Sequence, residues 1–433
     1  MPTPPPPSGP ASAEQAFLEL FAARFRDTVH CLGQFWRYSD GQWREVPLDA
    51  IHAELVTIIE GAHPADSSDA RRQIATTPDM LRTYGALPVE KWNADPARLP
   101  CRNGILTLAT RRLEPHAADL YLLRTLGVNY EPAARAPVWD AFLAGTVPSA
   151  ARFLQEFAGL CLTFDTRHET AVWLTGPPGS GKSTFLRGLE ILLGERAGVL
   201  DLAALDRGRL SATFLLGRSV LLSNEQPVAD LKHDHLLNAL ISGEPIPIQR
   251  SRHMPATITL RVTAKWVWAL THLPRLAYAG SGLFRRVRIV TFPPRALADR
   301  DPALKSRLAQ EGPGLLNWAL EGLARLQKRG RFQSAPAIQA AGESFHQAND
   351  LVAQFIADQA QRQPDASIQG SQLYSAYHTW CRQNGHPPLS GNGVAAEWER
   401  LGFQRRRVHG LSYWHGLQLN PSRPVAGPAG EQR

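Results

Sequence analysis

The stretch that decides the fold runs from Ala171 to Thr184 and reads AVWLTGPPGSGKST. Its first residues, up to Thr175, form an apolar run that predicts a short buried strand, and the residues after Lys182 have helical spacing. Between them lies a glycine-rich segment, starting at Gly176, that fits the pattern G-x-x-x-x-G-K-[ST] at every fixed position. A strand, this turn and a helix in that order predict a nucleotide-binding α/β core.

Each residue type in this segment has a task in holding phosphates. Glycines let the backbone turn tightly, so that successive N–H groups point at phosphate oxygens. Lys182 reaches the β- and γ-phosphates, and the Ser183 hydroxyl is placed to coordinate Mg²⁺. We therefore predict a nucleotide site formed by Gly176, Gly179, Ser180, Gly181, Lys182, Ser183 and Thr184. The loop alone leaves kinases, GTPases, transporter ATPases and helicases open.

A carboxylate is also needed, to hold Mg²⁺ or to orient the attacking water, and it should follow an apolar strand. The run Ser219-Val-Leu-Leu-Ser-Asn-Glu225 offers Glu225 for both roles, with Asn224 where a Mg²⁺-binding aspartate often stands. A solvated glutamate at a strand end is the alternative interpretation. Further apolar runs alternate with helical patterns downstream, which favours an α/β core; they lie at 256–262, 266–270 and 287–292.

Positive charge is concentrated in one part of the chain. The 433 residues carry 47 Lys and Arg against 39 Asp and Glu, a net charge of +8. Residues 246–300 alone contain ten basic residues and one acidic residue. Within them, Arg250, Arg252 and His253 lie at a turn between two strand-like runs, which predicts a basic hairpin that can follow a phosphate backbone. A solvated charged turn is the alternative.

The order of these motifs resembles a known family. The phosphate-binding loop and the segments 210–225, 241–252, 265–274 and 282–293 resemble the superfamily 3 helicase core of phage and plasmid primase-helicases, the family related to the poxvirus primase-helicase. Segments 37–43, 102–116 and 128–143 are similar to the region that precedes this core, and 373–403 is similar to its winged-helix end. The resemblance spans 35–420.

The resemblance implies an AAA+-like ring, expected to be a homo-hexamer, that hydrolyses ATP with Mg²⁺ between subunits and moves 3′ to 5′ on single-stranded DNA. Lys182 and Ser183 would then bind the phosphates and Mg²⁺, and Glu225 would polarise the water. The basic hairpin would line the pore. Arg286, with Arg285 as the second choice, would be an arginine finger inserted into a neighbour's site. A surface arginine pair is the alternative.

Three positions depart from the family pattern. His272 stands where the family usually has an asparagine that senses the γ-phosphate; an imidazole can donate the same hydrogen bond, and sensing would then depend on pH. Asn238 replaces a common lysine, and Glu244 replaces a common aspartate. These changes affect what we expect for the rate of ATP hydrolysis and for the details of the basic hairpin. They leave the prediction of nucleotide binding intact.

The C-terminal part contains a second basic run, Arg405, Arg406 and Arg407, after a helical segment. A helix followed by a basic β-ribbon suits a winged-helix module on duplex or forked DNA. A solvated charge run beside a structural wing is the alternative. The aromatic residues Tyr374, Tyr377 and Trp380 have helical spacing and are expected to pack in the core.

We therefore expect an α/β protein with an AAA+-like P-loop ATPase core and two flanking regions. The expected divisions are a disordered tail at 1–11, a helicase-associated α+β region at 12–145, the core at 146–328, a linker at 329–343, a winged-helix domain at 344–420 and a loose tail at 421–433. Within the α+β region, Asp40-Gly41 predicts a hairpin over 35–47, and Asn103-Gly104 predicts another turn.

Several classes are excluded at this level. No apolar run approaches the roughly 20 residues of a membrane span, the start lacks a signal-peptide pattern, and the four cysteines form no metal-binding pair, so we expect a reduced cytoplasmic protein. No primase centre is recognisable, so a primase would be a separate protein. The competing functions are a DNA-binding replication initiator or loader with a weakened ATPase, and a P-loop enzyme such as a small-molecule kinase.

Overall fold

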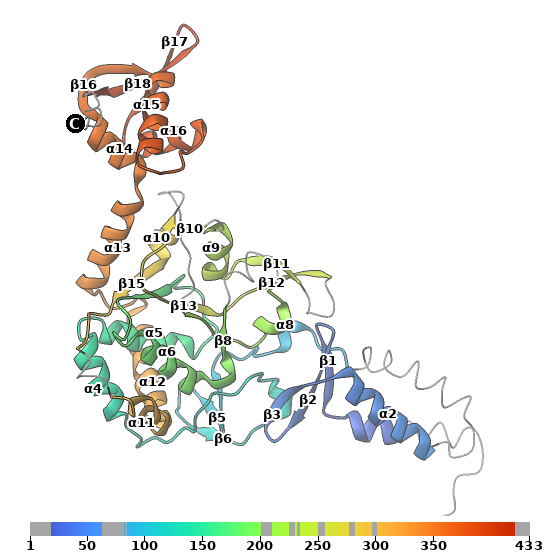
Figure 1. Ribbon diagram of the computed structural model, residues 1–433. Helices are drawn as coiled ribbons and strands as arrows, with labels where there is room; N and C mark the ends of the chain where they lie inside the picture. The colour runs from blue at the N-terminus through green and yellow to red at the C-terminus, as the bar shows by residue number, and fades with distance from the viewer. Residues whose placement is uncertain are drawn as a thin grey trace, which may run out of the picture. The chain divides into compact units, whose positions relative to one another are not determined.

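The computed structural model describes residues 19–62, 82, 85–200, 210–224, 230–231, 234–249, 256–276, 282–296 and 301–420. The chain divides into two compact units (Figure 1). The first comprises 1–226, 236–272 and 286–339, and the second comprises 227–235, 273–285 and 340–433. The expected α+β region therefore belongs to the same unit as most of the expected core.

A five-stranded parallel sheet forms the centre of the first unit. Its strands lie in the order β15 (Val287–Thr291), β7 (Ala171–Thr175), β13 (Lys265–Leu270), β9 (Val220–Asn224) and β8 (Ala197–Val199). All six residues of β13 and the first four of β7 are buried. Continuous apolar runs of this kind are typical of parallel strands covered on both faces. The predicted α/β class with a parallel sheet is confirmed in this unit.

Helices supply the apolar surfaces that cover the sheet. Trp139 shows how they pack: its ring stacks on Phe185 with centroids 5.6 Å apart and meets Trp318 edge to face. The backbones of two helices approach closely at Gly322, where a Cβ would overlap the carbonyl of Gln155. The helices of this part are α4 (Pro137–Thr146), α5 (Ala151–Cys161), α6 (Lys182–Leu193), α8 (Ala212–Leu215), α9 (Asp234–Ser242), α11 (Leu304–Gln310) and α12 (Gly312–Arg329), with a 3-10 turn at Gly194–Arg196. Helix α10 (Leu283–Arg286) crosses the division, since its first three residues belong to the second unit.

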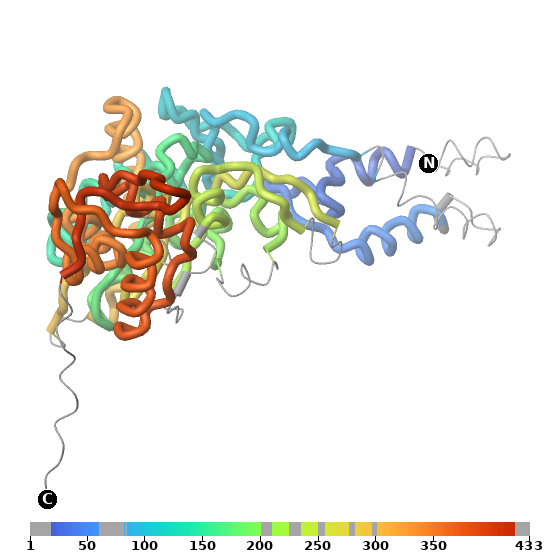
Figure 2. Tube along the Cα trace, turned by 90° about the horizontal axis from the view of Figure 1, so that it is seen from above, coloured from blue at the N-terminus to red at the C-terminus, as the bar shows by residue number. Residues whose placement is uncertain are grey.

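The N-terminal part of this unit contains an antiparallel sheet of β1 (Thr28–Cys31), β2 (Gln34–Ser39) and β3 (Gln42–Val46). Asp40 and Gly41 both have positive φ, 51° and 76°, which is the two-residue turn that suits a twisted hairpin. The predicted hairpin is confirmed. One face of the sheet packs on α2 (Leu48–Ala62), and the other buries Trp36 and Trp43 against Trp92. In both views α2 lies at the end of the unit, beyond this small sheet (Figure 2).

A second antiparallel sheet joins β4 (Arg98–Cys101), β5 (Gly104–Thr107) and β6 (Leu113–Glu114), with 3-10 turns at Val89–Lys91 and Ala118–Leu120. The predicted turn at Asn103-Gly104 lies one residue earlier, because Cys101 pairs with Gly104. The Asn103 amide exchanges two hydrogen bonds with the Tyr130 backbone, of 2.9 and 3.0 Å, which fixes the asparagine inside the turn.

The basic hairpin predicted around residue 250 is present in its two strands. β11 (Pro245–Gln249) pairs antiparallel with β12 (Thr257–Arg261) over five residue pairs. Its tip, with Arg250, Arg252 and His253, lies outside the described residues.

The second unit is built around a small three-helix and three-strand arrangement. Its antiparallel sheet has the order β16 (Ala360–Gln369), β18 (Leu411–Leu419) and β17 (Gln404–Val408). Tyr377 and Trp380 are buried in its core with Trp398 and Trp414, as expected, whereas Tyr374 is partly exposed. The helices are α14 (Leu351–Gln359), α15 (Gly370–Gln383) and α16 (Gly391–Arg400), and a short parallel pair joins β10 (Asp230–Leu231) to β14 (Arg275–Leu276).

The expected linker at 329–343 is irregular only in its first half. Helix α13 (Pro336–Asn349) begins inside it, and the two units meet in sequence at 339/340, within this helix. Pro336 is the first residue of the helix, where its missing N–H removes no hydrogen bond, so this proline starts a helix and does not mark a linker. Across the described residues, no helix combines the length and the apolarity needed to cross a membrane.

Candidate functional site

The predicted nucleotide site lies at the carboxyl edge of the parallel sheet. Gly176, Gly179 and Gly181 follow β7 and adopt φ values of 149°, 78° and 109°, which glycine tolerates and other residues do not. A Cβ at Gly176 would overlap the carbonyl oxygen of Phe292, at the end of β15. The tight turn predicted from the glycine spacing is therefore present, and it lies against the neighbouring strand.

Lys182 is the buried centre of this loop. Its side chain is 3% exposed, and its Nζ donates to the carbonyl oxygens of Gly176, at 2.6 Å, and Pro177, at 3.0 Å. The backbone thus curls around an ammonium and turns two carbonyl oxygens toward it. A phosphate oxygen offers such an ammonium a stronger, charge-assisted hydrogen bond.

The start of α6 completes the loop. No side chain caps this helix, so its first N–H groups are left to backbone partners, water or a ligand. Ser183, in the first turn, is exposed, whereas Ser180 is buried with an Oγ that has no hydrogen-bond partner among the described residues. The site thus combines the start of a 12-residue helix without a side-chain cap, the Ser180 hydroxyl and the buried Lys182 ammonium. These groups fit a nucleotide phosphate chain with Mg²⁺.

Two other strand ends share this edge. Leu270 pairs with Thr175, so β13 ends beside β7 and His272 leaves the sheet next to the loop. Asn224 ends β9, one strand further, and pairs with Ala269. Both His272 and Asn224 are exposed, as a side chain that meets a ligand should be. Glu225 lies outside the described residues.

The amino edge of the same sheet carries a different set of buried cations. Lys265 donates from Nζ to the carbonyl oxygens of Thr163 and Thr263, and Arg196 donates from Nη1 to Leu162 at 3.0 Å. The carbonyls of Leu162 and Thr163 follow the end of α5, where cations are favourable. Burial lowers the pKa of Lys265 to about 7 and that of Arg196 to about 10.

The arginine pair before β15 is split between two environments. Arg286 is 7% exposed; its Nε donates to Glu169 Oε2 at 2.9 Å, and its Nη1 donates to Asn238 Oδ1 at 3.1 Å. Arg285 is exposed. The carbonyl oxygen of the Asn238 side chain thus accepts a hydrogen bond from a guanidinium that a lysine at this position would repel. Of the two candidates for a residue that reaches another subunit, Arg285 is the accessible one.

Glu169 is the residue of this site that the sequence did not reveal. It lies 117 positions before Arg286, in a short Arg-His-Glu-Thr segment without a motif. Its positive φ of 40° shows a turn just before β7, which places its carboxylate beside the start of β15. Only the strand order β15-β7 brings the two residues together.

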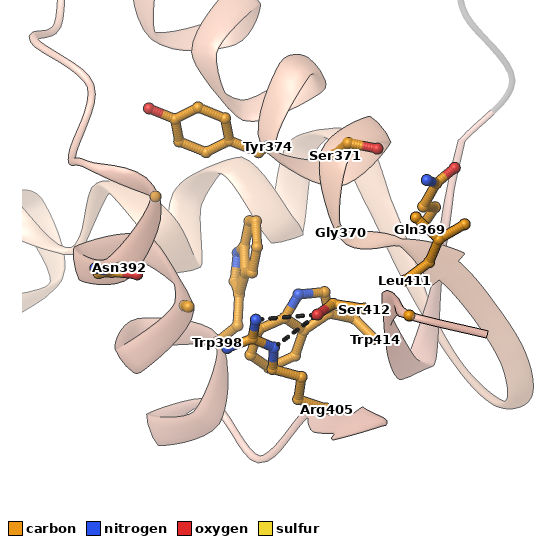
Figure 3. A pocket seen from close by; sticks show the side chains of 13 residues that line it. Gln369, Gly370, Ser371, Tyr374, Asn392, Trp398, Arg405, Leu411, Ser412 and Trp414 are labelled. Atoms are coloured by element: carbon orange, nitrogen blue, oxygen red, sulfur yellow. Dashed lines mark hydrogen bonds between the residues drawn. The ribbon is translucent and has the colours of Figure 1, made fainter. Parts of the chain in front are cut away.

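The second basic run lies on β17, in the C-terminal unit. Arg405, Arg406 and Arg407 are all exposed. Arg405 donates from Nε and Nη2 to Ser412 Oγ, at 3.2 and 3.0 Å, so its guanidinium is held against β18. It lines a pocket of about 320 Å³ together with the starts of α15 and α16 and the rings of Trp398 and Trp414 (Figure 3).

Comparison with known proteins bears on the fold and on the N-terminal part. Residues 15–148 match the family model described as "D5 N terminal like", which covers the expected helicase-associated region. No curated protein matches the chain. The apo A form of the NrS-1 C-terminal region is similar, with a TM-score of 0.54 and 11% identity over 92% of this chain and 98% of that one.

A second structure of the same NrS-1 region gives a TM-score of 0.53 and 10% identity, over 93% of this chain and all of that one. At such low identity the likeness concerns the fold, which is a mixed α/β arrangement with a parallel sheet and flanking helices. It extends over nearly the whole length of both chains, so it includes the C-terminal unit as well as the sheet.

Proposed function

We propose that this chain is an ATP-dependent DNA helicase that acts in the replication of a phage, plasmid or other mobile element. The observation that carries the proposal is the loop between β7 and α6, in which Lys182 is buried inside a curl of backbone beside an uncapped helix. The match of residues 15–148 to a D5 N terminal like region, ahead of this loop, supports the same family.

The loop residues divide the work of nucleotide binding. Lys182 leaves the carbonyls of Gly176 and Pro177 and pairs with the phosphates, while the N–H groups at the start of α6 hold phosphate oxygens. Ser183 and Glu225 would hold Mg²⁺, which would supply neutralising charge at the phosphates. Glu225 orients the attacking water, and His272 donates to the γ-phosphate from the adjoining strand end.

The place of the arginine pair supports assembly into a ring. Arg285 and Arg286 precede β15 at the amino edge of the sheet, whereas the loop lies at the carboxyl edge. A strand of five residues spans about 16 Å at roughly 3.3 Å per residue. The pair therefore serves a neighbour's nucleotide and not its own, and its exposed member, Arg285, is the better finger in a homo-hexamer.

DNA contacts come from two hairpins. The β11–β12 hairpin, with Arg250, Arg252 and His253 at its tip, follows single-stranded DNA in the pore and leads into β13, whose far end carries His272. In the C-terminal unit, the order α14-β16-α15-α16-β17-β18 and the sheet order β16-β18-β17 support the proposal of a winged helix, with Arg405 to Arg407 on its wing. This module docks on duplex or forked DNA, and a separate primase supplies primers.

The test is ATP hydrolysis with and without single-stranded DNA. Wild type should hydrolyse ATP faster when DNA is present, and Lys182→Ala should lose roughly a hundredfold or more, because the phosphates lose their central cation. Lys328→Ala, which removes an exposed lysine from α12, is the matched control and should behave as wild type. Equal hydrolysis by Lys182→Ala and wild type would refute the proposal.

A further inference from the structure

The tip of the β17–β18 hairpin exposes two aliphatic side chains. Val408 is 46% exposed and Leu411 is 47% exposed, and they are two of the five large hydrophobic residues classed as exposed in the part of the chain that the structure describes. They face each other across the last pair of the hairpin. Single exposed aliphatics need no explanation, but a pair at the end of a rigid projection presents a small apolar surface.

The turn fixes the direction of that surface. His409 and Gly410 adopt φ values of 49° and 82°, so the hairpin closes with a two-residue turn that sets the strand register. Val408 and Leu411 therefore share one face with the preceding pair, Arg406 and Tyr413. The outward face thus carries two aliphatics, one guanidinium and one phenol ring.

The other face of the hairpin is tied to the body of the unit. Arg405 pairs with Trp414, which is buried, and Arg407 pairs with Ser412. The two hydrogen bonds from Arg405 to Ser412 hold the guanidinium in one orientation, so little freedom is lost when it binds an anion. Residues 404–419 contain three arginines and no acidic residue. This composition complements a polyanion that also exposes an apolar plane.

We propose that the β17–β18 hairpin binds the junction between duplex and single-stranded DNA, with Val408 and Leu411 packed on the last base pair and the arginines on the flanking phosphates. The proposal deepens the proposed function and rests on it for the choice of DNA as the partner. The side of an intact duplex presents phosphates and groove edges, whereas an end or a fork also exposes the plane of a base pair. The apolar tip suits the exposed base pair of a fork, and the arginines beside it suit the phosphates of the fork.

The pocket at the base of the hairpin takes the first unpaired nucleotide. Its volume of about 320 Å³ lies within the usual range of small-ligand sites. Figure 3 shows Leu411 and Gln369 at one side of the pocket, Asn392 at the other, and Arg405 joined to Ser412 between them. Amide groups recognise base edges and a guanidinium recognises a phosphate, so the lining suits one nucleotide.

The experiment measures binding of the full chain, without nucleotide, to a forked duplex, to a blunt duplex of the same sequence and to single-stranded DNA. The test variant combines Val408→Ser with Leu411→Ser. The matched control is Val199→Ser, at the end of β8, because Val199 is 68% exposed and lies in the other unit. Leu411→Ser alone is a milder second variant, and thermal unfolding verifies that each protein is folded.

Wild type and Val199→Ser should prefer the fork to single-stranded DNA, and the double variant should lose about fivefold to tenfold of that preference while its binding to single-stranded DNA stays the same. Binding to the blunt duplex, whose ends also expose a base pair, should weaken in the double variant as well. 2-Aminopurine at the junction should brighten on binding of wild type and stay quenched with the double variant. Arg405→Gln should weaken fork binding and lower the slope of log affinity against log salt by about one.

Equal fork preference and equal 2-aminopurine signals in the double variant and wild type would overturn the proposal. Tip-dependent binding to phosphatidylserine vesicles, without a fork preference, would also overturn it and assign the hairpin to a membrane surface. The outcome is separable from the ATPase: DNA-stimulated hydrolysis with tip-independent fork binding rejects only the hairpin proposal. Tip-dependent fork binding without any hydrolysis rejects only the helicase.

Discussion

The two edges of the parallel sheet both bury cations, but they do so in different ways. At the carboxyl edge, Lys182 lies inside a glycine-rich loop and donates to two carbonyl oxygens of that loop. At the amino edge, Lys265 and Arg196 hold carbonyls beyond the end of α5, and Arg286 is paired with a carboxylate. The first arrangement leaves a cation that a ligand can recruit, whereas the second uses cations to join elements.

The comparison predicts that substitutions at the two edges fail in different assays. A change at the carboxyl edge should remove activity and spare stability. A change at a buried cation of the amino edge should lower stability and spare nucleotide binding. Burial alone does not distinguish the two, since Lys182 and Lys265 are almost equally buried; the surrounding backbone does.

The largest effect is expected for Lys182→Ala. Hydrolysis should fall roughly a hundredfold or more, while the free energy of unfolding changes by no more than about 1 kcal/mol, because the cost of burying the ammonium offsets most of what its hydrogen bonds to the loop carbonyls contribute. Urea unfolding beside steady-state hydrolysis measures both. If Lys182→Ala loses activity only because it is much less stable, the claim that the two edges of the sheet have different roles is contradicted.

The next effect concerns the exposed member of the arginine pair. Arg285→Ala should reduce hydrolysis in the assembled ring by roughly a hundredfold or more, because a guanidinium that reaches the neighbour's nucleotide stabilises the charge of the transition state. Stability should not change. Mixing Arg285→Ala with Lys182→Ala subunits checks the geometry, since a mixed ring regains some sites with both residues intact. No recovery on mixing would contradict a finger that acts in trans.

A smaller effect is expected for the buried member. Arg286→Ala should lower the free energy of unfolding by about 1–3 kcal/mol, because the guanidinium joins Glu169 to Asn238. The loss of stability stays moderate because the Glu169 side chain is 45% exposed, so water can hydrate its carboxylate when the guanidinium is removed. Urea midpoints measure it, with Arg285→Ala as the control. Equal urea midpoints for Arg286→Ala and Arg285→Ala would show that the buried arginine contributes no more to stability than the exposed one.

The last effect, which is small over any single pH unit, is a pH dependence at Lys265. Burial lowers its pKa from the ordinary 10.5 to about 7, with Arg196 acting in the same direction and Cys161 and Asp165 against it. Between these values the unfolded chain binds the proton and the folded chain does not, so stability rises with pH. From pH 7 to 10, the free energy of unfolding of wild type should rise relative to that of Lys265→Met by up to about 1.4 kcal/mol for each pH unit. Parallel stability curves for the two proteins would contradict the assignment.

The sequence predicted those parts of the fold that local residues determine. The run from Ala171 to Thr184 contains the strand, the turn and the helix start, and Asp40-Gly41 sets a hairpin by its own backbone preferences. The turn near Asn103 was misplaced because a contact with Tyr130, 27 positions away, holds the asparagine. Pro336 was taken for a linker residue although proline is also well suited to a helix start.

The candidate site was predictable to the same extent. The phosphate-binding loop is one continuous segment, so its residues were named from their spacing. Which of Arg285 and Arg286 is buried depends on Glu169, the partner of Arg286. Glu169 is distant in the sequence, and the pairing of β15 with β7 brings it close. The same holds for β10 and β14, which follow β9 and β13 in the sequence: they are paired with each other and belong to the C-terminal unit, and no local pattern shows this.

The central claim is tested most directly by separation of a forked DNA duplex that carries a single-stranded 3′ tail. Wild type should release the displaced strand when ATP and Mg²⁺ are present, a fork with only a 5′ tail should stay intact, and Lys182→Ala should release nothing while binding the fork as wild type does. Tight, sequence-specific duplex binding without strand release would contradict the helicase and identify an initiator or loader.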